Sequence, residues 1–499
     1  MSLYFLLLAV VTLCLGLNTT ATIAGSCKDS IPCKKYRAKN RSQRLHLGSV
    51  AADLISGRSQ NFLAGDKLKY RMMSTIIPPL LVLLFTLTSC DASAMNPQPI
   101  AIKGPFFQGW LLRTVDHVNS RSFILIIGSF SSKGSMNYDE HYIFCGISTR
   151  DQGTVSFEAF PAPESVTVAG SVPTTPSIFA KLRPSLMKNT NITWSAKDIG
   201  TFKFTDEGCD ADFKIGESHI KFTTVERLPW SKSNIQSAGP EGWLGYTSLL
   251  PCHYFVHSVG STCSYSLTVP ATTLPESENI TLAINSNGSQ AENHNSTVYA
   301  GNGFTHIEGN HGSFFPSGWV WSQASSCDNS ASFSLTGGKF EIGIFTPITF
   351  ILFVRNKGKT KIFRTTGLDK FEYDVDGIQG SVKLIAYSFS KKDRVELIIK
   401  PKASILSTAN PFGRPLYIPT SSGFRNNPGC IETYTADAQV IHSELSSSSS
   451  SEYLEINRID FPLTALEFGG SFQGLRSQSK SKVTNSLSDT LQQPDITDL

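Results

Sequence analysis

The run HIEGNHGSFFPSGWVWSQ, which begins at His306, places three acid–base side chains beside several large aromatic ones. His306, Glu308 and His311 can each carry a proton, and Trp319 and Trp321 follow them closely. A carboxylic acid buried among apolar groups keeps its proton at a higher pH than it does in water, so it can donate a proton near neutral pH. The run therefore predicts an apolar pocket with a proton donor in its wall, or else a strand with a hydrogen-bonded polar turn. Both interpretations stay open.

Two further runs combine aromatic residues with polar ones. GPFFQGW encloses Gln108, and CHYFVHSVG carries His253 and His257. On a helix, an offset of four residues would place both histidines on one face, as a metal site requires. On the strand that this run predicts, the same offset separates them by about 13 Å. We therefore expect no metal site here, and the simpler interpretation of either histidine is a buried, hydrogen-bonded residue.

Other catalytic and metal-binding templates are missing. The chain has no G-x-S-x-G nucleophile turn, phosphate-binding glycine loop, dinucleotide fingerprint or H-E-x-x-H pair. The cysteines beyond residue 94 show no C-x-x-C spacing, so we expect no structural metal and no cofactor. An even number of cysteines behind a signal peptide permits three disulfides. These cysteines are Cys145, Cys209, Cys252, Cys263, Cys327 and Cys430.

The 499-residue chain has 40% hydrophobic and 10% aromatic residues, a composition typical of globular domains with apolar interiors. Its net charge of +4 conceals an uneven distribution, because the stretch from Cys27 to Arg71 alone carries about +8. The remainder, from Met72 onward, is therefore mildly acidic, at about −4. It has no basic stripe that could follow a phosphate backbone, so we expect no nucleic-acid partner.

Two apolar segments stand in series near the start of the sequence. LYFLLLAVVTLCLGL resembles a secretory signal segment, and IIPPLLVLLFTL follows a basic stretch and precedes an Ala-x-Ala cleavage site that ends at Ala94. Either translation begins near Met72, or residues 1–94 form a compound leader. Both alternatives predict a signal peptide and a secreted or lumenal protein, and the compound leader also leaves a plastid open. We expect the mature chain to begin near Met95.

From about residue 104 onward, short runs rich in β-branched and aromatic residues are separated by Gly, Asn, Ser and Pro. Examples are SFILIIGSF, TVSFEAF, ITFILFV and RVELIIK, and no stretch shows an apolar stripe of helical period. This pattern predicts an all-β protein of two antiparallel barrel or sandwich domains. We place the first β-domain at 98–324 and the second at 325–474, and we expect the polar tail at 475–499 to be disordered.

The order of several motifs resembles the tocopherol cyclase family. The motifs are GPFFQGW, LLPCHYFVHSVG, EGNHGSFFPSGWVWSQ, PTSSGFRNNPGCIET and ALEFGG, which together span most of 104–470. The most specific part of the resemblance is the spacing of Phe315, Pro316, Trp319, Trp321 and Gln323. The resemblance implies two lipocalin-like β-barrels packed together, with a more distant similarity to carotenoid-hydratase-like proteins.

The resemblance also implies an activity, the cyclisation of a prenylated hydroquinone to a chromanol in an apolar barrel pocket. Such a reaction needs a donor that protonates an alkene, aromatic faces that stabilise the carbocation intermediate, and the exclusion of water. We expect Glu308, His311 and His253 to be catalytic. Either Glu308 or His311 in its protonated form is expected to donate the proton, and His253 or Asn310 to orient the phenol. The residues expected to bind the substrate are Phe107, Gln108, Trp110, Tyr254, Asn310, Phe315, Trp319, Trp321 and Gln323.

The expected partner is a hydrophobic small molecule, a prenylquinol or a similar lipid, and such a substrate is compatible with peripheral contact with a membrane. The alternative function is a non-catalytic, calycin-like protein of the secretory pathway that binds a lipid or a pigment. The two functions predict the same pocket and differ in whether the bound molecule reacts.

Overall fold

The computed structural model describes residues 105–133, 138–150, 153–170, 191–205, 207–230, 239–242, 250–270, 296–341, 346–402, 413–447 and 451–476. The expected leader at 1–94, with its cleavage site, lies outside these residues, as does most of the expected tail. Entry into the secretory pathway therefore stays a prediction. Within the described ranges, no helix is long and apolar enough to cross a membrane.

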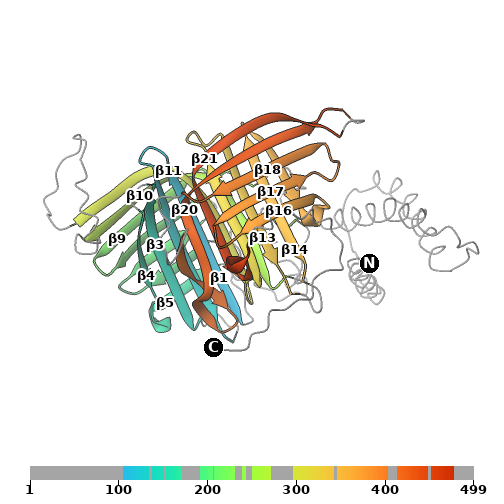
Figure 1. Cartoon of the computed structure of the whole chain (residues 1–499). Helices are drawn as coiled ribbons and strands as arrows, with labels where there is room; N and C mark the ends of the chain where they lie inside the picture. Colours follow the sequence, from blue (N-terminus) through green and yellow to red (C-terminus); the bar gives the residue numbers. More distant parts are fainter. Residues whose placement is uncertain are drawn as a thin grey trace, which may run out of the picture. The chain divides into compact units, whose positions relative to one another are not determined.

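The first sheet contains eleven strands in the order β4-β3-β2-β1-β11-β10-β9-β8-β7-β6-β5. The sheet is curled (Figure 1). β4 contacts β8 around a core that includes Trp194, Phe202 and Phe213. Its strands are β1 (Phe106–Asp116), β2 (Arg121–Ser131), β3 (Glu140–Thr149), β4 (Gly153–Ala159), β5 (Val166–Gly170), β6 (Ile192–Ala196), β7 (Gly200–Phe204), β8 (Cys209–Ile215), β9 (Ser218–Val225), β10 (Cys252–Pro270) and β11 (Ser296–Gly312).

The second sheet contains ten strands in the order β15-β14-β13-β12-β21-β20-β18-β17-β16, with β19 paired to β20. A separate core, which includes Leu352, Leu384 and Phe461, covers one of its faces. Its strands are β12 (Gly318–Ser325), β13 (Ala331–Lys339), β14 (Ile348–Asn356), β15 (Lys359–Arg364), β16 (Lys370–Asp376), β17 (Ser381–Tyr387), β18 (Asp393–Lys400), β19 (Arg414–Thr420), β20 (Gly423–Leu445) and β21 (Tyr453–Gly470). Short 3-10 helices are η1 (Pro163–Ser165), η6 (Thr365–Gly367) and η8 (Ser471–Gly474).

The prediction of an all-β protein with two packed antiparallel domains is confirmed. Strand pairs in both sheets are antiparallel, and the part of the chain that the structure describes contains no α-helix. The chain passes from the first sheet to the second between Gly312 and Gly318, upstream of the boundary expected at 324. The reason is that β12 pairs with β13 and β21 and so belongs to the second sheet from its first residue.

Strands at the contact between the sheets are buried on both faces. Every residue of β12 is buried, whereas β8 and β9 alternate between buried and exposed residues because only one of their faces meets a core. A third cluster lies between the sheets and draws Phe107 and Tyr254 from the first sheet and Trp321 and Tyr434 from the second. This shared layer is where the candidate site lies.

Arg113 of β1 joins the two sheets at this layer. Its fully buried guanidinium donates hydrogen bonds to the Gln323 side-chain oxygen at 2.7 Å and to the Tyr434 carbonyl at 3.4 Å. It also donates to the Leu463 carbonyl and to the Ser122 hydroxyl. Burial lowers the pKa of Arg113 to about 9, so the group is still a cation near neutral pH.

Candidate functional site

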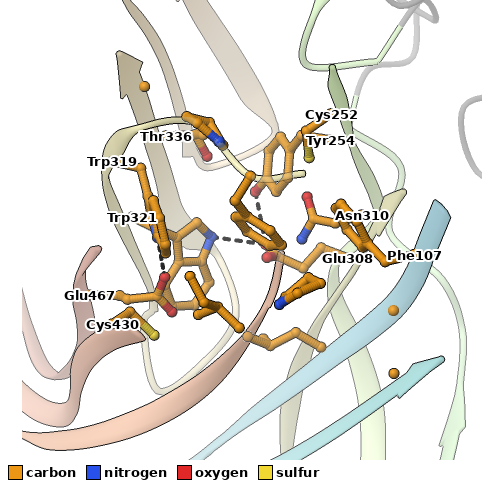
Figure 2. Close-up of a pocket in the computed structure, with 18 of the residues that line it drawn as sticks. Phe107, Cys252, Tyr254, Glu308, Asn310, Trp319, Trp321, Thr336, Cys430 and Glu467 are labelled. Carbon is orange, nitrogen blue, oxygen red and sulfur yellow. Dashed lines mark hydrogen bonds between the residues drawn. The ribbon is translucent and has the colours of Figure 1, made fainter. Parts of the chain in front are cut away.

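An apolar cavity of about 180 Å³ lies between the two sheets (Figure 2). Its walls come chiefly from β1, β2, β10 and β11 of the first sheet and from β12, β13, β14, β19, β20 and β21 of the second. Three carboxyl groups, those of Glu241, Glu308 and Glu467, are set into this otherwise largely apolar surface. The expected pocket inside a barrel is therefore corrected, because the cavity lies where the sheets meet.

The alternation of side chains along β11 decides which expected residues reach the cavity. Glu308 and Asn310 are separated by two residues, so they share the face that lines it. His311 stands at an odd offset from Glu308 and lies on the opposite face, where its ring stacks on Phe255 with centroids 5.1 Å apart. Glu308 and His311, which were both expected to be catalytic, therefore lie on opposite faces of the strand.

Three donors surround one oxygen of Glu308. Its Oε2 accepts hydrogen bonds from the Tyr254 hydroxyl at 2.8 Å and from the Trp321 indole at 2.9 Å, and His306 Nε2 also lies 2.9 Å away. Figure 2 shows the carboxyl group between Trp321 and Tyr254. Its Oε1 makes no hydrogen bond to any other described residue. The protein thus fixes the carboxyl group through one oxygen and leaves the other for a ligand.

Glu467 of β21 lies in the same wall and was not among the expected site residues. It accepts a hydrogen bond from the Trp319 indole and lies beside Cys430 (Figure 2). Burial raises the pKa of Glu467 to about 7; the Trp319 hydrogen bond opposes this rise and the negative charge of Glu308 adds to it. Near neutral pH, Glu467 is therefore present in both its protonated and its ionised form. This makes it the cavity group best suited to donate a proton.

Aromatic rings form a continuous side of the cavity. Phe107 stacks on Phe315 with ring centroids 5.1 Å apart, and Phe315 lies 5.1 Å from Trp319. Trp110 belongs to the wall, but its ring packs 5.7 Å from Phe202 in the core of the first sheet. Of the residues expected to bind the substrate, those that line the cavity are Phe107, Gln108, Trp110, Tyr254, Asn310, Phe315, Trp319 and Trp321.

His253 and His311, both expected to be catalytic, do not line the cavity. Their ring centroids lie 5.4 Å apart, and His253 Nδ1 is 2.8 Å from an oxygen of Glu241. Burial, the largest cause, acts together with the neighbouring His253 and His257 to lower the pKa of His311 to about 3. The expected role of His311 as a protonated donor is therefore corrected, because its ring is neutral near pH 7 and faces away from the cavity.

The two glutamines expected to bind the substrate have different surroundings. Gln323 lies outside the cavity wall and accepts a hydrogen bond from Arg113, so its expected role is corrected to that of an anchor between the sheets. The side-chain alternation of β12 explains this, since the face that carries Trp319 at the cavity continues to Gln323 at the contact with Arg113. Gln108 contributes to the wall but pairs with His311, which places its side chain on the inner face of the first sheet.

All six cysteines beyond residue 94 are free thiols, so the three disulfides that the sequence permits are not formed. Cys145, Cys209 and Cys263 lie in the core of the first sheet. Cys252 and Cys430 line the cavity, and burial raises the pKa of each well above its ordinary value. Both cavity cysteines are therefore neutral thiols near neutral pH.

The described residues contain one group whose ligand atoms lie close enough together to hold a metal ion: Asp393, His442 and Glu444. Lys361 already bonds Asp393 and lies 3.7 Å from Glu444, so a side-chain cation balances these carboxylates. The group does not line the cavity.

No protein-family model matches the chain, and neither does any curated protein sequence. Membership of the tocopherol cyclase family therefore stays a prediction. Solved structures with a similar fold include CghA bound to Sch210972, with 10% identity and a TM-score of 0.42 over 73% of this chain and 88% of that one. A protein assigned as AttH from Nitrosomonas europaea has 10% identity and a TM-score of 0.37 over 73% and 92%.

Kievitone hydratase from Nectria haematococca has 9% identity and a TM-score of 0.34 over 76% of this chain and 92% of that one. With so few shared residues and such low TM-scores, none of these likenesses carries an argument about activity.

Proposed function

We propose that the chain catalyses an acid–base isomerisation of an uncharged, unsaturated lipid, namely the cyclisation of a prenylated hydroquinone to a chromanol. One observation carries this proposal. One apolar cavity holds Glu467, a carboxylic acid that is partly protonated near neutral pH, together with a second carboxyl group, Glu308, fixed by three donors. A reaction of a hydrophobic substrate that passes through a carbocation needs a proton donor and a second carboxyl group in an apolar cavity.

In the proposed reaction, Glu467 donates its proton to the alkene of the prenyl chain. The tertiary cation that develops lies against Trp319 and Trp321, which both line the cavity. Aromatic faces stabilise a cation by on the order of 1–2 kcal/mol each when water is excluded. The phenol oxygen then forms a bond to the cationic carbon and closes the ring.

Glu308 accepts the proton that the phenol loses. One proton leaves Glu467 and one arrives at Glu308, so substrate and product are isomers and the reaction needs no oxidant or reductant. Asn310 lies beside Glu308 in Figure 2, and its side-chain amide makes no hydrogen bond to another described residue, so it can hold the phenol hydroxyl. These residues supply proton donor, proton acceptor and orientation from one cavity.

The size of the cavity limits which part of the substrate is enclosed. An apolar cavity of about 150 Å³ is sufficient for benzene. The cavity here, of about 180 Å³, therefore encloses one ring with the adjacent alkene, and a longer prenyl chain must extend beyond it. Enclosing the reacting atoms also keeps out water, which would otherwise trap the cation as an alcohol.

The test measures quinol binding and chromanol formation in Glu467→Gln and Glu308→Gln. The control is Glu455→Gln, which changes an exposed glutamate on the same strand as Glu467. We expect Glu467→Gln to lower turnover by about 100-fold or more, the usual scale for a lost general acid. Binding should stay within a few-fold of wild type because the aromatic wall is unchanged, and the control should behave as wild type.

The alternative function, a non-catalytic carrier of a lipid or a pigment, predicts a different result. Wild type would bind the quinol and form no chromanol. That result would overturn the cyclase proposal.

A further inference from the structure

Another buried carboxyl group, that of Glu432, lies directly behind Glu467. The two residues are opposite one another in the ladder between β20 and β21, and Trp321 is opposite Glu467 on the other side. Residues directly opposite in an antiparallel pair share one face, with Cβ atoms about 5 Å apart. Trp321, Glu467 and Glu432 therefore form a row across three neighbouring strands, and the row begins in the cavity wall.

Glu432 is 1% exposed and is not part of the cavity wall. Its Oε2 accepts a hydrogen bond from the Tyr434 hydroxyl at 2.7 Å. Its Oε1 is buried and has no hydrogen-bond partner among the described residues. A buried carboxylate with an unsatisfied oxygen is costly, whereas a neutral carboxylic acid at the same place costs much less.

The surroundings keep Glu432 neutral. Burial raises its pKa well above the ordinary value, and the charge of Glu467 adds to the rise. Two adjacent buried carboxyl groups cannot both ionise without strong repulsion, so the pair keeps at least one proton. The groups that face this pair are Trp319 on β12, Glu308 on β11, Cys430 and Tyr434 on β20, Arg113 on β1, and Arg414 on β19, which is bonded to Glu158.

We propose that Glu432 is a proton store that re-protonates Glu467 after each turnover. This inference rests on the proposed function, because it assigns the step that follows proton donation by Glu467. The proton on Glu432 moves to the Glu467 carboxylate, and the phenol proton held by Glu308 then returns to Glu432. One proton is passed round three carboxyl groups, and each group ends in its starting state.

The test separates the first turnover from the following ones in Glu432→Gln. Glu467 is already protonated in part of the resting enzyme, so the amplitude and rate of the first turnover should stay within about twofold of wild type. Steady-state turnover should fall by about tenfold or more, since re-protonation becomes slow. Equal losses in both phases, or no loss in either, would overturn the proton store. Glu455→Gln, on the surface of β21, is the matched control.

Infrared titration tests the same inference without substrate, so it remains informative if the cyclase proposal fails or if Glu432→Gln does not fold. The C=O stretch of a buried, protonated carboxyl group should persist in Glu467→Gln at pH values where an ordinary, exposed glutamate is ionised, because burial raises the pKa of Glu432 well above its ordinary value. Absence of that band in Glu467→Gln under these conditions would show that Glu432 is ionised and would overturn the inference.

Discussion

Burial has opposite chemical consequences in the cavity and on the inner face of the first sheet. In the cavity it raises the pKa of Glu467 to about 7, and on the inner face it lowers the pKa of His311 to about 3. Both shifts favour the neutral form of the group. A neutral carboxyl group still carries an acidic proton, whereas a neutral imidazole has no proton of comparable acidity to donate. The comparison explains why we assign proton donation to the cavity carboxyl and not to the histidines.

Arg113 is a third kind of buried ionisable group, and it differs from Glu467 and His311 because it stays charged near neutral pH. Replacing it with alanine leaves the Leu463 carbonyl and Gln323 without their donor. We expect Arg113→Ala to lower the free energy of unfolding by about 3–5 kcal/mol. Urea denaturation measures this loss. Arg458→Ala, an exposed arginine on β21, should leave the midpoint almost unchanged, and an equal effect of both substitutions would contradict the role of Arg113.

The pH dependence of turnover tests the cavity side of the comparison directly. The acid form of Glu467 is lost as the pH rises through about 7. We therefore expect kcat/KM to fall tenfold per pH unit above that value, which amounts to about 100-fold by pH 9. A profile of kcat/KM that stays level up to pH 9 would show that Glu467 is not the donor.

The pH dependence of stability tests the inner face. Because the pKa of His311 is about 3 in the folded chain and 6.5 in the reference state, the unfolded chain binds more protons between these values. The contribution of His311 to the free energy of unfolding should therefore be fully present above pH 6.5. It should decrease as the pH falls toward 3, by up to about 1.4 kcal/mol per pH unit.

Replacing the histidine removes its contribution to that slope. His311→Gln should unfold with a shallower dependence on pH between 6.5 and 3 than wild type. His219→Gln, which changes a half-exposed histidine on β9, is the control and should retain the wild-type slope. An unchanged slope in His311→Gln would mean that this ring is protonated in the folded chain.

The smallest expected effect concerns the indole that holds Glu308. Trp321→Phe keeps an aromatic face but removes the N–H group that donates to Glu308 Oε2 at 2.9 Å. A hydrogen bond to a carboxyl group contributes about 1–2 kcal/mol, so turnover should fall by roughly tenfold while quinol binding changes little. Trp230→Phe is the matched control, since its buried indole nitrogen has no partner among the described residues. Similar losses in both variants would assign the effect to packing.

Part of this site could be predicted from local sequence. The even spacing of Trp319 and Trp321 places both on one face of a strand, and both line the cavity with Glu308 from the same run. The odd offset between Glu308 and His311 places these two side chains on opposite faces of any regular strand. The parity of the spacing is therefore sufficient to separate the histidine from the carboxyl group.

The rest of the site depends on pairings between distant parts of the chain. Glu467 reaches the cavity because β21 pairs with β12, more than one hundred residues earlier in the sequence. The one local signal was an acidic residue in the otherwise apolar run ALEFGG. The location of the cavity between the sheets could not be predicted, because the sequence pattern shows that a face is buried and not which element covers it.

The row of Trp321, Glu467 and Glu432 lies on β12, β21 and β20, which each have a hydrogen-bonded neighbour on both sides. Amide protons in such interior strands exchange with deuterium only when the sheet opens as a unit. The spacing of the two carboxyl groups is therefore as durable as the sheet itself. Slow amide exchange in these three strands and loss of catalysis on heating should then report the same event, the opening of the second sheet.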